Sequence, residues 1–181
     1  MKFLLLTVAA CASPAPSTFR AIFFTSAGDF AVDCHRDWAP IGVDQLYQLL
    51  LARHYDDTRI YRMVPGWVAQ FGYSGNPSLQ RELMRSPIPD DPVLTHNLAG
   101  IISYSAAYNE AQSHATNRTS ELFINLADHP QLDALGFAPI CEVAEGGMDV
   151  VQRFHSGYGE VRGSKEGQME VPSPLARHRY R

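Results

Sequence analysis

The fold of this chain is predicted by the stretch Tyr61-Arg62-Met63-Val64-Pro65-Gly66-Trp67-Val68-Ala69-Gln70-Phe71-Gly72. Its aromatic and β-branched residues favour two short strands, and Pro65-Gly66 between them favours a turn. Arg62 and Gln70 are its only long polar side chains. Alternation along a strand cannot be carried through the turn, so whether these two share a face stays open. Taken alone, the stretch predicts a hairpin of a β-barrel whose arginine side chain extends to solvent.

The same stretch resembles a strand pair of the cyclophilins, the peptidyl-prolyl isomerases. That family has an aromatic residue, Arg, two apolar residues, Pro-Gly, an aromatic residue, two further residues and Gln. Two later blocks resemble the family as well, and the similarity covers roughly Phe19 to Tyr158 in order. The later blocks are Gly100 to Ala106 with Glu121 to Asn125, and Leu132 to Ile140 with Gly147 to Val151.

The resemblance implies a mostly β fold, a closed antiparallel β-barrel with two covering α-helices. Local patterns agree, because Phe19 to Phe24 and Phe30 to Cys34 predict a hairpin and Pro40 opens a helical pattern. A closing helix is expected over Gly147 to Phe154, and a short one over Ser78 to Arg85. The family returns a final strand to close the barrel. Here Val161 to Val171 is polar, so that strand is missing or unrecognisable.

The composition fits one domain with a core of ordinary size, at 181 residues and 45% hydrophobic content. The net charge of -4 and a pI near 5.9, without a basic stripe, give no sign of a nucleic-acid partner. The seven histidines show no metal-ligand spacing, so no metal and no cofactor are expected. We expect a monomer.

The first residues are typical of an export signal, with Lys2, an apolar run and the small residues Ala10-Cys11-Ala12. The run is too short for a permanent membrane span. A lipid on Cys11 is the alternative. We therefore expect a signal peptide and linker over 1–17, the isomerase domain over 18–159 and a polar, mobile tail over 160–181, in a chain that is secreted or delivered to a lumen or periplasm.

Two local features allow two interpretations each. Cys34 and Cys141 could form a disulfide in an exported protein, or could remain two buried free thiols. Asn117-Arg118-Thr119 is an N-glycosylation sequon, usable if the host glycosylates exported proteins, or else a capped loop.

Rotation about an X-Pro bond breaks amide resonance against a barrier of about 18–20 kcal/mol, but no bond is cleaved. The reaction needs an apolar pocket for the proline ring, a donor for the imide nitrogen and polar groups that hold the substrate backbone. By resemblance, Arg62 is the donor and Gln70 holds the backbone. The pocket walls are then Trp67, Phe123, Leu132 and Phe137, with Val68, Ser105 and Ala106 at neighbouring groove positions. Phe123 and Leu132 could equally be plain core residues.

The chain departs from the family at four positions. It has Glu121 in place of Gln, Gln131 in place of Trp, Phe137 in place of His and Trp67 in place of Phe. Glu121, a groove residue, could pair with Arg62 and compete with the substrate, or could orient it; the nearby charge predicts a lowered carboxyl pKa.

The expected activity is isomerisation of X-Pro bonds in client proteins of the export route. The alternative is a proline-peptide binding module of the same fold without turnover. A hydrolase built on Ser74 is disfavoured, because Asn76 replaces the second glycine of the Gly-x-Ser-x-Gly motif.

Overall fold

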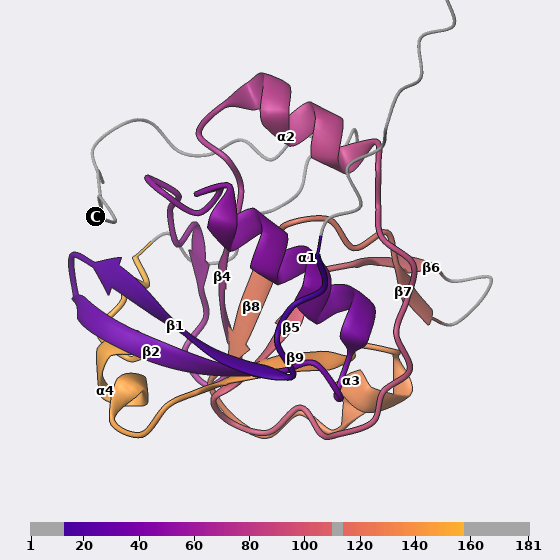
Figure 1. The fold of residues 1–181 in the computed structure, drawn as a ribbon. Coiled ribbons are helices and arrows are strands. Elements are labelled where there is room, and N and C mark those ends of the chain that lie inside the picture. Colours follow the sequence, from indigo (N-terminus) through magenta and orange to yellow (C-terminus); the bar gives the residue numbers. More distant parts are fainter. Residues whose placement is uncertain (1–12, 110–113, 158–181) are drawn as a thin grey trace, which may run out of the picture.

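The computed structural model describes residues 13–109 and 114–157, in which one curled antiparallel sheet dominates (Figure 1). Its strand order is β1-β2-β9-β5-β8-β4-β3. The strands are β1 (Thr18–Thr25), β2 (Gly28–His35), β3 (Arg62–Met63), β4 (Val68–Phe71), β5 (Ile101–Tyr104), β8 (Leu122–Asn125) and β9 (Pro139–Val143). A separate hairpin pairs β6 (Ala107–Asn109) with β7 (His114–Thr116).

The predicted fold class is confirmed: the protein is mostly β, and its antiparallel sheet curls into a half-barrel. The structure differs from the predicted closed barrel in one respect, the closure of the sheet. Within the described ranges, β1 and β3 are the two edges of the sheet, and no hydrogen-bonded pairing joins them. The polar character of the sequence after residue 160 is consistent with this seam. The predicted leader up to residue 12 and the predicted tail lie outside the described residues.

Four helices accompany the sheet in the described part of the chain, α1 (Pro40–Leu51), α2 (Pro77–Met84), α3 (Gln131–Ala134) and α4 (Gly147–Val151). α1 packs against β2 and β9, and α4 packs against β2, so the two expected covering helices are present. α4 ends three residues earlier than expected, although Phe154 is buried beyond it. α2 is the short helix expected over Ser78 to Arg85, and the Asn76 side chain caps its first turn by accepting from two backbone N–H groups. The single turn of α3 was not predicted.

Alternation along the strands gives the sheet two different faces. One face carries Ala69 and Phe71 of β4 and Leu122 and Ile124 of β8, all of which belong to the main hydrophobic core. Side chains at the intervening positions must point the other way. Among them, Val68 and Phe123 belong to a second, smaller cluster outside the main core. The same two strands therefore serve the core on one side and a separate surface on the other.

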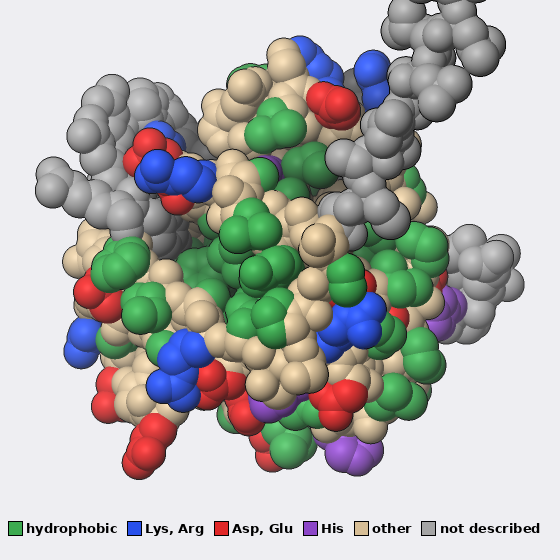
Figure 2. Space-filling model, viewed as in Figure 1, with side chains coloured by type: hydrophobic (Ala, Val, Ile, Leu, Met, Phe, Trp, Pro, Cys, Tyr) green, Lys and Arg blue, Asp and Glu red, His purple; other side chains and the backbone are tan. Residues whose placement is uncertain are grey.

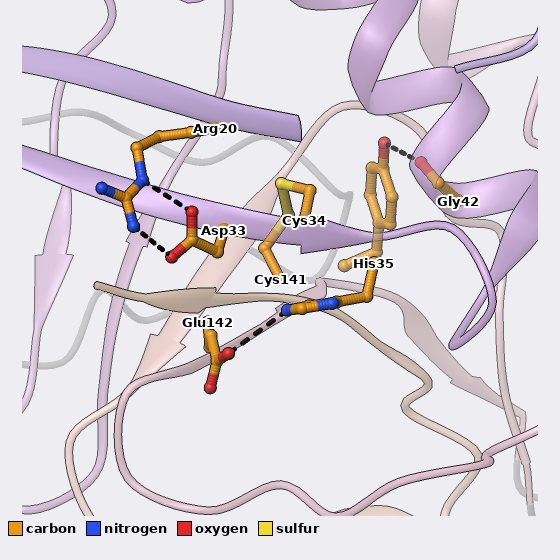
Figure 3. The surroundings of a disulfide bond; sticks show 8 residues. Arg20, Asp33, Cys34, His35, Gly42, Cys141 and Glu142 are labelled. Atoms are coloured by element: carbon orange, nitrogen blue, oxygen red, sulfur yellow. Dashed lines mark hydrogen bonds and ion pairs between the residues drawn. A yellow bond between two sulfur atoms is a disulfide. The ribbon is translucent and has the colours of Figure 1, made fainter. Parts of the chain in front are cut away.

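Of the two alternatives for the cysteines, a disulfide or two free thiols, the structure shows the disulfide. Cys34 of β2 is bonded to Cys141 of β9 (Figure 3). The two residues are direct partners across the antiparallel strands, with Cα atoms 4.0 Å apart. Both cysteines are fully buried. Polar pairs lie around them, with His35 Nε2 3.2 Å from a Glu142 oxygen and Arg20 donating twice to Asp33 at 2.7 Å. The bond thus joins two strands in the centre of the core.

The face seen in Figure 2 gathers hydrophobic side chains over α1. The large exposed apolar residues include Leu51 at the end of α1, with Ile22 and Phe24 on the edge strand β1. Phe19 of β1 and Tyr47 of α1 lie between these elements, with ring centroids 5.2 Å apart. None of the helices in the described ranges is long and apolar enough to cross a membrane.

Candidate functional site

All ten predicted site residues line one cavity of about 620 Å³. They are Arg62, Trp67, Val68, Gln70, Ser105, Ala106, Glu121, Phe123, Leu132 and Phe137. Among the described residues, five more that the sequence did not indicate also line it: Tyr73, Met84, Ala107, Asn117 and Thr119. We call this cavity the groove. Its volume lies in the range of ordinary ligand pockets.

The sheet register explains why polar and apolar groove residues meet. Arg62 of β3 lies directly opposite Gln70 of β4, which lies opposite Phe123 of β8. Directly opposed residues of antiparallel strands project to the same face. The question left open by the Pro65-Gly66 turn is thus decided: Arg62 and Gln70 share the groove face.

The amide of Gln70 connects the polar residues of the groove. Arg62 Nη1 donates to Gln70 Oε1 over 2.6 Å. Gln70 Nε2 donates to Ser105 Oγ over 2.7 Å and to Glu121 Oε1 over 3.1 Å. The amide oxygen therefore faces the guanidinium, and the amide nitrogen faces the carboxylate.

Glu121 is held by hydroxyl groups as well as by Gln70. The hydroxyl of Tyr61 donates to its Oε1, and Tyr73 and Ser105 also hydrogen-bond to the carboxyl. Burial raises the pKa of Glu121 above the ordinary 4.5, although these hydrogen bonds and the charge of Arg62 act to lower it. The predicted direction of this shift, a lowered pKa, is therefore wrong. The expectation counted the arginine charge but not the loss of solvation at this position.

The apolar part of the groove is a cluster of its own. Val68, Phe123 and Leu132 are buried together, with Trp67, Leu135 and Phe137 packed against them. The rings of Phe123 and Phe137 meet edge to face with centroids 5.7 Å apart. Phe123 and Leu132 are thus buried, as a core role requires, but they belong to the groove cluster rather than to the main core.

His129 restrains Trp67, one of the residues that line the groove. The two rings have centroids 4.2 Å apart, and His129 Nε2 lies 2.9 Å from the Trp67 carbonyl oxygen. Contacts to both the ring and the backbone restrict how the indole can turn.

A buried polar network behind the pocket holds α3 and the segment after it. The Asn97 side chain donates to Asp133 Oδ1 over 2.7 Å and to the Phe137 carbonyl over 2.8 Å. Its oxygen accepts from Ser103 and Asn125 on β5 and β8. Asn97 is fully buried. One side chain therefore ties the elements that carry Leu132 and Phe137 to the sheet.

Some of the residues that were not predicted had a signal in the sequence, and others had none. Tyr61 adjoins Arg62, so its place in the predicted strand was a usable signal. Asn97 and Asp133 stand 36 positions apart, in a loop and a single helical turn, and nothing in the sequence links them. In the described part of the chain, no group of three His, Cys, Asp or Glu side chains could hold a metal ion.

Comparison with known proteins identifies the family of the chain. The model of the family described as "Cyclophilin type peptidyl-prolyl cis-trans isomerase/CLD" matches residues 21–173. Peptidyl-prolyl cis-trans isomerase-like 1 of Aspergillus niger is 32% identical over 137 residues, which cover 73% of this chain and 78% of that protein. Peptidyl-prolyl cis-trans isomerase A of Dickeya dadantii is 26% identical over 154 residues, covering 82% and 77%.

Solved structures share the fold at lower identity. The Mimivirus cyclophilin superposes with a TM-score of 0.60 at 21% identity, covering 84% of this chain and 86% of that one. A cyclophilin-type isomerase of Cryptosporidium parvum gives a TM-score of 0.60 at 16% identity, covering 90% and 93%. The family match and the homologues define the class of this protein, a peptidyl-prolyl cis-trans isomerase. The chain belongs to the cyclophilin-type peptidyl-prolyl cis-trans isomerase family.

Proposed function

We propose that the groove catalyses rotation of X-Pro bonds with Arg62 as the donor, and that its clients are proteins of the export route. The observation that carries the catalytic proposal is the pair formed by Arg62 Nη1 and Gln70 Oε1 at 2.6 Å, in a cavity that also contains Trp67, Phe123 and Phe137. The guanidinium of Arg62, oriented by Gln70, thus shares one cavity with an apolar surface suited to a proline ring.

The mechanism requires no covalent step. As the X-Pro bond twists, the imide nitrogen loses conjugation and its lone pair becomes an acceptor. The guanidinium of Arg62 donates to that lone pair, which is available only in the twisted state. The interaction therefore stabilises the transition state more than the substrate. Every 1.36 kcal/mol of this difference accelerates rotation about tenfold.

Gln70 and Glu121 orient the donor in this mechanism. A carboxylate only accepts hydrogen bonds, so the Gln70 amide must turn its nitrogen toward Glu121. Its oxygen then faces Arg62, which limits the positions that the guanidinium can take. Ser105 accepts from the same nitrogen and reinforces this orientation.

The substrate class follows from the pocket and from a relative. A Cryptosporidium parvum cyclophilin, with a TM-score of 0.57 and 17% identity to this chain, was solved in the presence of the dipeptide ala-pro. Prolyl segments of client proteins are accordingly the proposed substrates here, bound by a monomer. Export is supported by the apolar run after Lys2 and by the disulfide, since disulfides persist mainly in oxidising compartments.

Replacing the donor tests the catalytic proposal. Arg62→Ala should lower kcat/KM on a short X-Pro peptide by about 10²–10³-fold, the usual cost of losing one transition-state donor. The melting temperature should stay within about 2 °C, because the side chain lies at the groove rather than in the main core. Arg59→Ala, the loss of an exposed arginine three positions away, is the matched control and should retain full activity.

The same experiment separates catalysis from simple binding. Parent protein that binds the peptide in calorimetry without accelerating its isomerisation would make this chain a binding module of the same fold. Arg62→Ala with the parent rate would remove the guanidinium from the mechanism.

A further inference from the structure

The sequon at residues 117–119 lies at the rim of the groove. Asn117 follows β7 and is exposed, whereas its neighbour Arg118 is only 3% exposed. Arg118 donates to Asp90 and to the Gly136 carbonyl, and its own carbonyl oxygen accepts from the Ile88 N–H. The middle residue of the sequon is therefore anchored in the protein, which fixes the position of Asn117 on the groove rim.

A purely local role does not account for this tripeptide. Asn117 adopts a φ of 64°, and asparagine is among the few residues that tolerate that region. That tolerance explains the asparagine but not the threonine two positions later. In the ranges that the structure describes, the Asn117 side chain makes no hydrogen bond, so it caps no turn there. Its amide is exposed beside Thr119 on the groove lining.

We propose that Asn117 carries an N-linked glycan that stands at the mouth of the groove. The inference rests on the proposed export of the chain, because the acceptor must reach a compartment that holds the sugar donor. The glycan is bulky and polar, and the exposed amide leaves it room in solvent. The disulfide between Cys34 and Cys141 independently suits an oxidising compartment of that kind.

The transfer balances without a redox partner. The Asn117 amide nitrogen attacks the anomeric carbon of a lipid-pyrophosphate-linked oligosaccharide supplied by the host. A nitrogen–carbon bond forms, the bond from that carbon to the pyrophosphate oxygen breaks, and the lipid pyrophosphate leaves. The amide gives up one proton to a base of the host transferase. The transfer precedes folding, after which docking of Arg118 places the glycan at the rim.

The glycan has a predictable effect on access. A short X-Pro peptide can enter the groove beside it, whereas a partly folded client must bring a larger surface past the rim. The glycosylated protein should therefore favour short or fully extended segments. Removing the sugar should raise kcat/KM for a refolding protein relative to kcat/KM for a short peptide.

Expression of the full chain in a secreting eukaryotic cell tests the site. The secreted protein is treated with peptide N-glycosidase and its mass is compared before and after. We expect a mass loss and conversion of Asn117 to Asp, read by peptide mass spectrometry. Thr119→Ala should show neither change, and Thr119→Ser, which keeps the sequon hydroxyl, should show both.

A second sample separates failure of the site from failure of export. The same chain is fused to a heterologous secretion leader, and the N-terminus of the secreted product is sequenced. Secreted, leader-free protein whose mass does not change on treatment would overturn the proposal, whichever leader delivered it. Glycosylation with the heterologous leader alone would uphold the site and refute the chain's own export signal. Equal ratios of protein to peptide turnover before and after treatment would overturn the effect on access.

Discussion

Glu121 is the residue at which this groove departs most from its family, because it introduces a negative charge beside Arg62. Its Oε1 accepts from Gln70 and from Tyr61, so the ionised form fixes the amide whose oxygen faces the guanidinium. A protonated carboxyl can also donate, and the requirement on the amide orientation is then lost. The ionisation state of Glu121 should therefore affect turnover through Gln70.

The pH profile of turnover checks this role. Burial raises the pKa of Glu121 above 4.5, so kcat/KM of the parent should fall as the pH drops through that raised value. Glu121→Gln should remove this step and give a flat profile, since an amide does not titrate here. Turnover of the variant at neutral pH should fall toward that of the parent at low pH, because an amide, like a protonated carboxyl, can also donate and no longer fixes the orientation of Gln70. A clear increase in turnover would instead mean that Glu121 competes with the substrate for Arg62.

Glu121→Gln should also change how the stability of the protein depends on pH. A carboxyl whose pKa is higher in the folded state binds protons more tightly there, so its contribution to stability is lost as the pH rises through the folded value. As the pH rises through the folded-state pKa of Glu121, the free energy of unfolding of Glu121→Gln should therefore increase relative to that of the parent. Urea unfolding on both sides of the step measures the difference, and parallel pH curves for the two proteins would contradict the assigned shift.

At the scale of elements, the groove wall depends on α3 and on the segment that follows it. A four-residue helix makes few hydrogen bonds of its own, so α3 needs external support. Asn97 supplies that support through Asp133 and the Phe137 carbonyl. The positions of Leu132 and Phe137 in the groove wall therefore depend on the hydrogen bonds of the Asn97 side chain.

Asn97→Ala should weaken substrate binding more than it slows the bound reaction. The variant leaves buried partners without a hydrogen bond, at a cost of about 1–3 kcal/mol in the free energy of unfolding. We expect a raised KM with kcat closer to the parent value, measured well below the melting temperature. As a control, Asp44→Ala on α1 removes the carboxylate that accepts from Arg36 and from the Ala15 N–H, and it should destabilise the fold without raising KM. An unchanged KM in Asn97→Ala would show that α3 holds its position unaided.

The elements also show which parts of the fold are readable from sequence. The hairpin of β1 and β2, the strands β3 and β4, and α1 have strong local patterns, and all were predicted. For α4 the start was right but the end was not, because Phe154 remains buried after the helix has ended. The ten groove residues came from resemblance to a family, and the register of β3, β4 and β8 supplies the physical reason. The Asn97 network could not be predicted, since its contacts form only when distant segments fold together.

On the scale of the whole molecule, the disulfide constrains a long loop. Cys34 and Cys141 are 107 positions apart, and linking them restricts the unfolded chain. Bonds of this kind contribute about 2–5 kcal/mol to small exported domains. The bonded strands, β2 and β9, contribute none of the groove residues.

The double variant Cys34→Ala/Cys141→Ala should therefore lose stability and keep its activity. We expect the free energy of unfolding to fall by about 2–5 kcal/mol, with kcat/KM on a short peptide unchanged well below the melting temperature. Either single variant breaks the same bond and should cost about as much. A reducing agent should lower the melting temperature of the parent but not of the double variant. Lost turnover in a fully folded double variant would show that the core bond shapes the groove.

The groove and the main core use different residues, so the substrate preference of this protein can change without a change in its core. Three of its departures from the family, Trp67, Glu121 and Phe137, line the groove, and none of them belongs to the main core. Substitutions at these positions can therefore change the preferred client sequences while the core-facing residues of β4 and β8 continue to specify the fold. Directed evolution of substrate range should accordingly confine its libraries to these three groove positions.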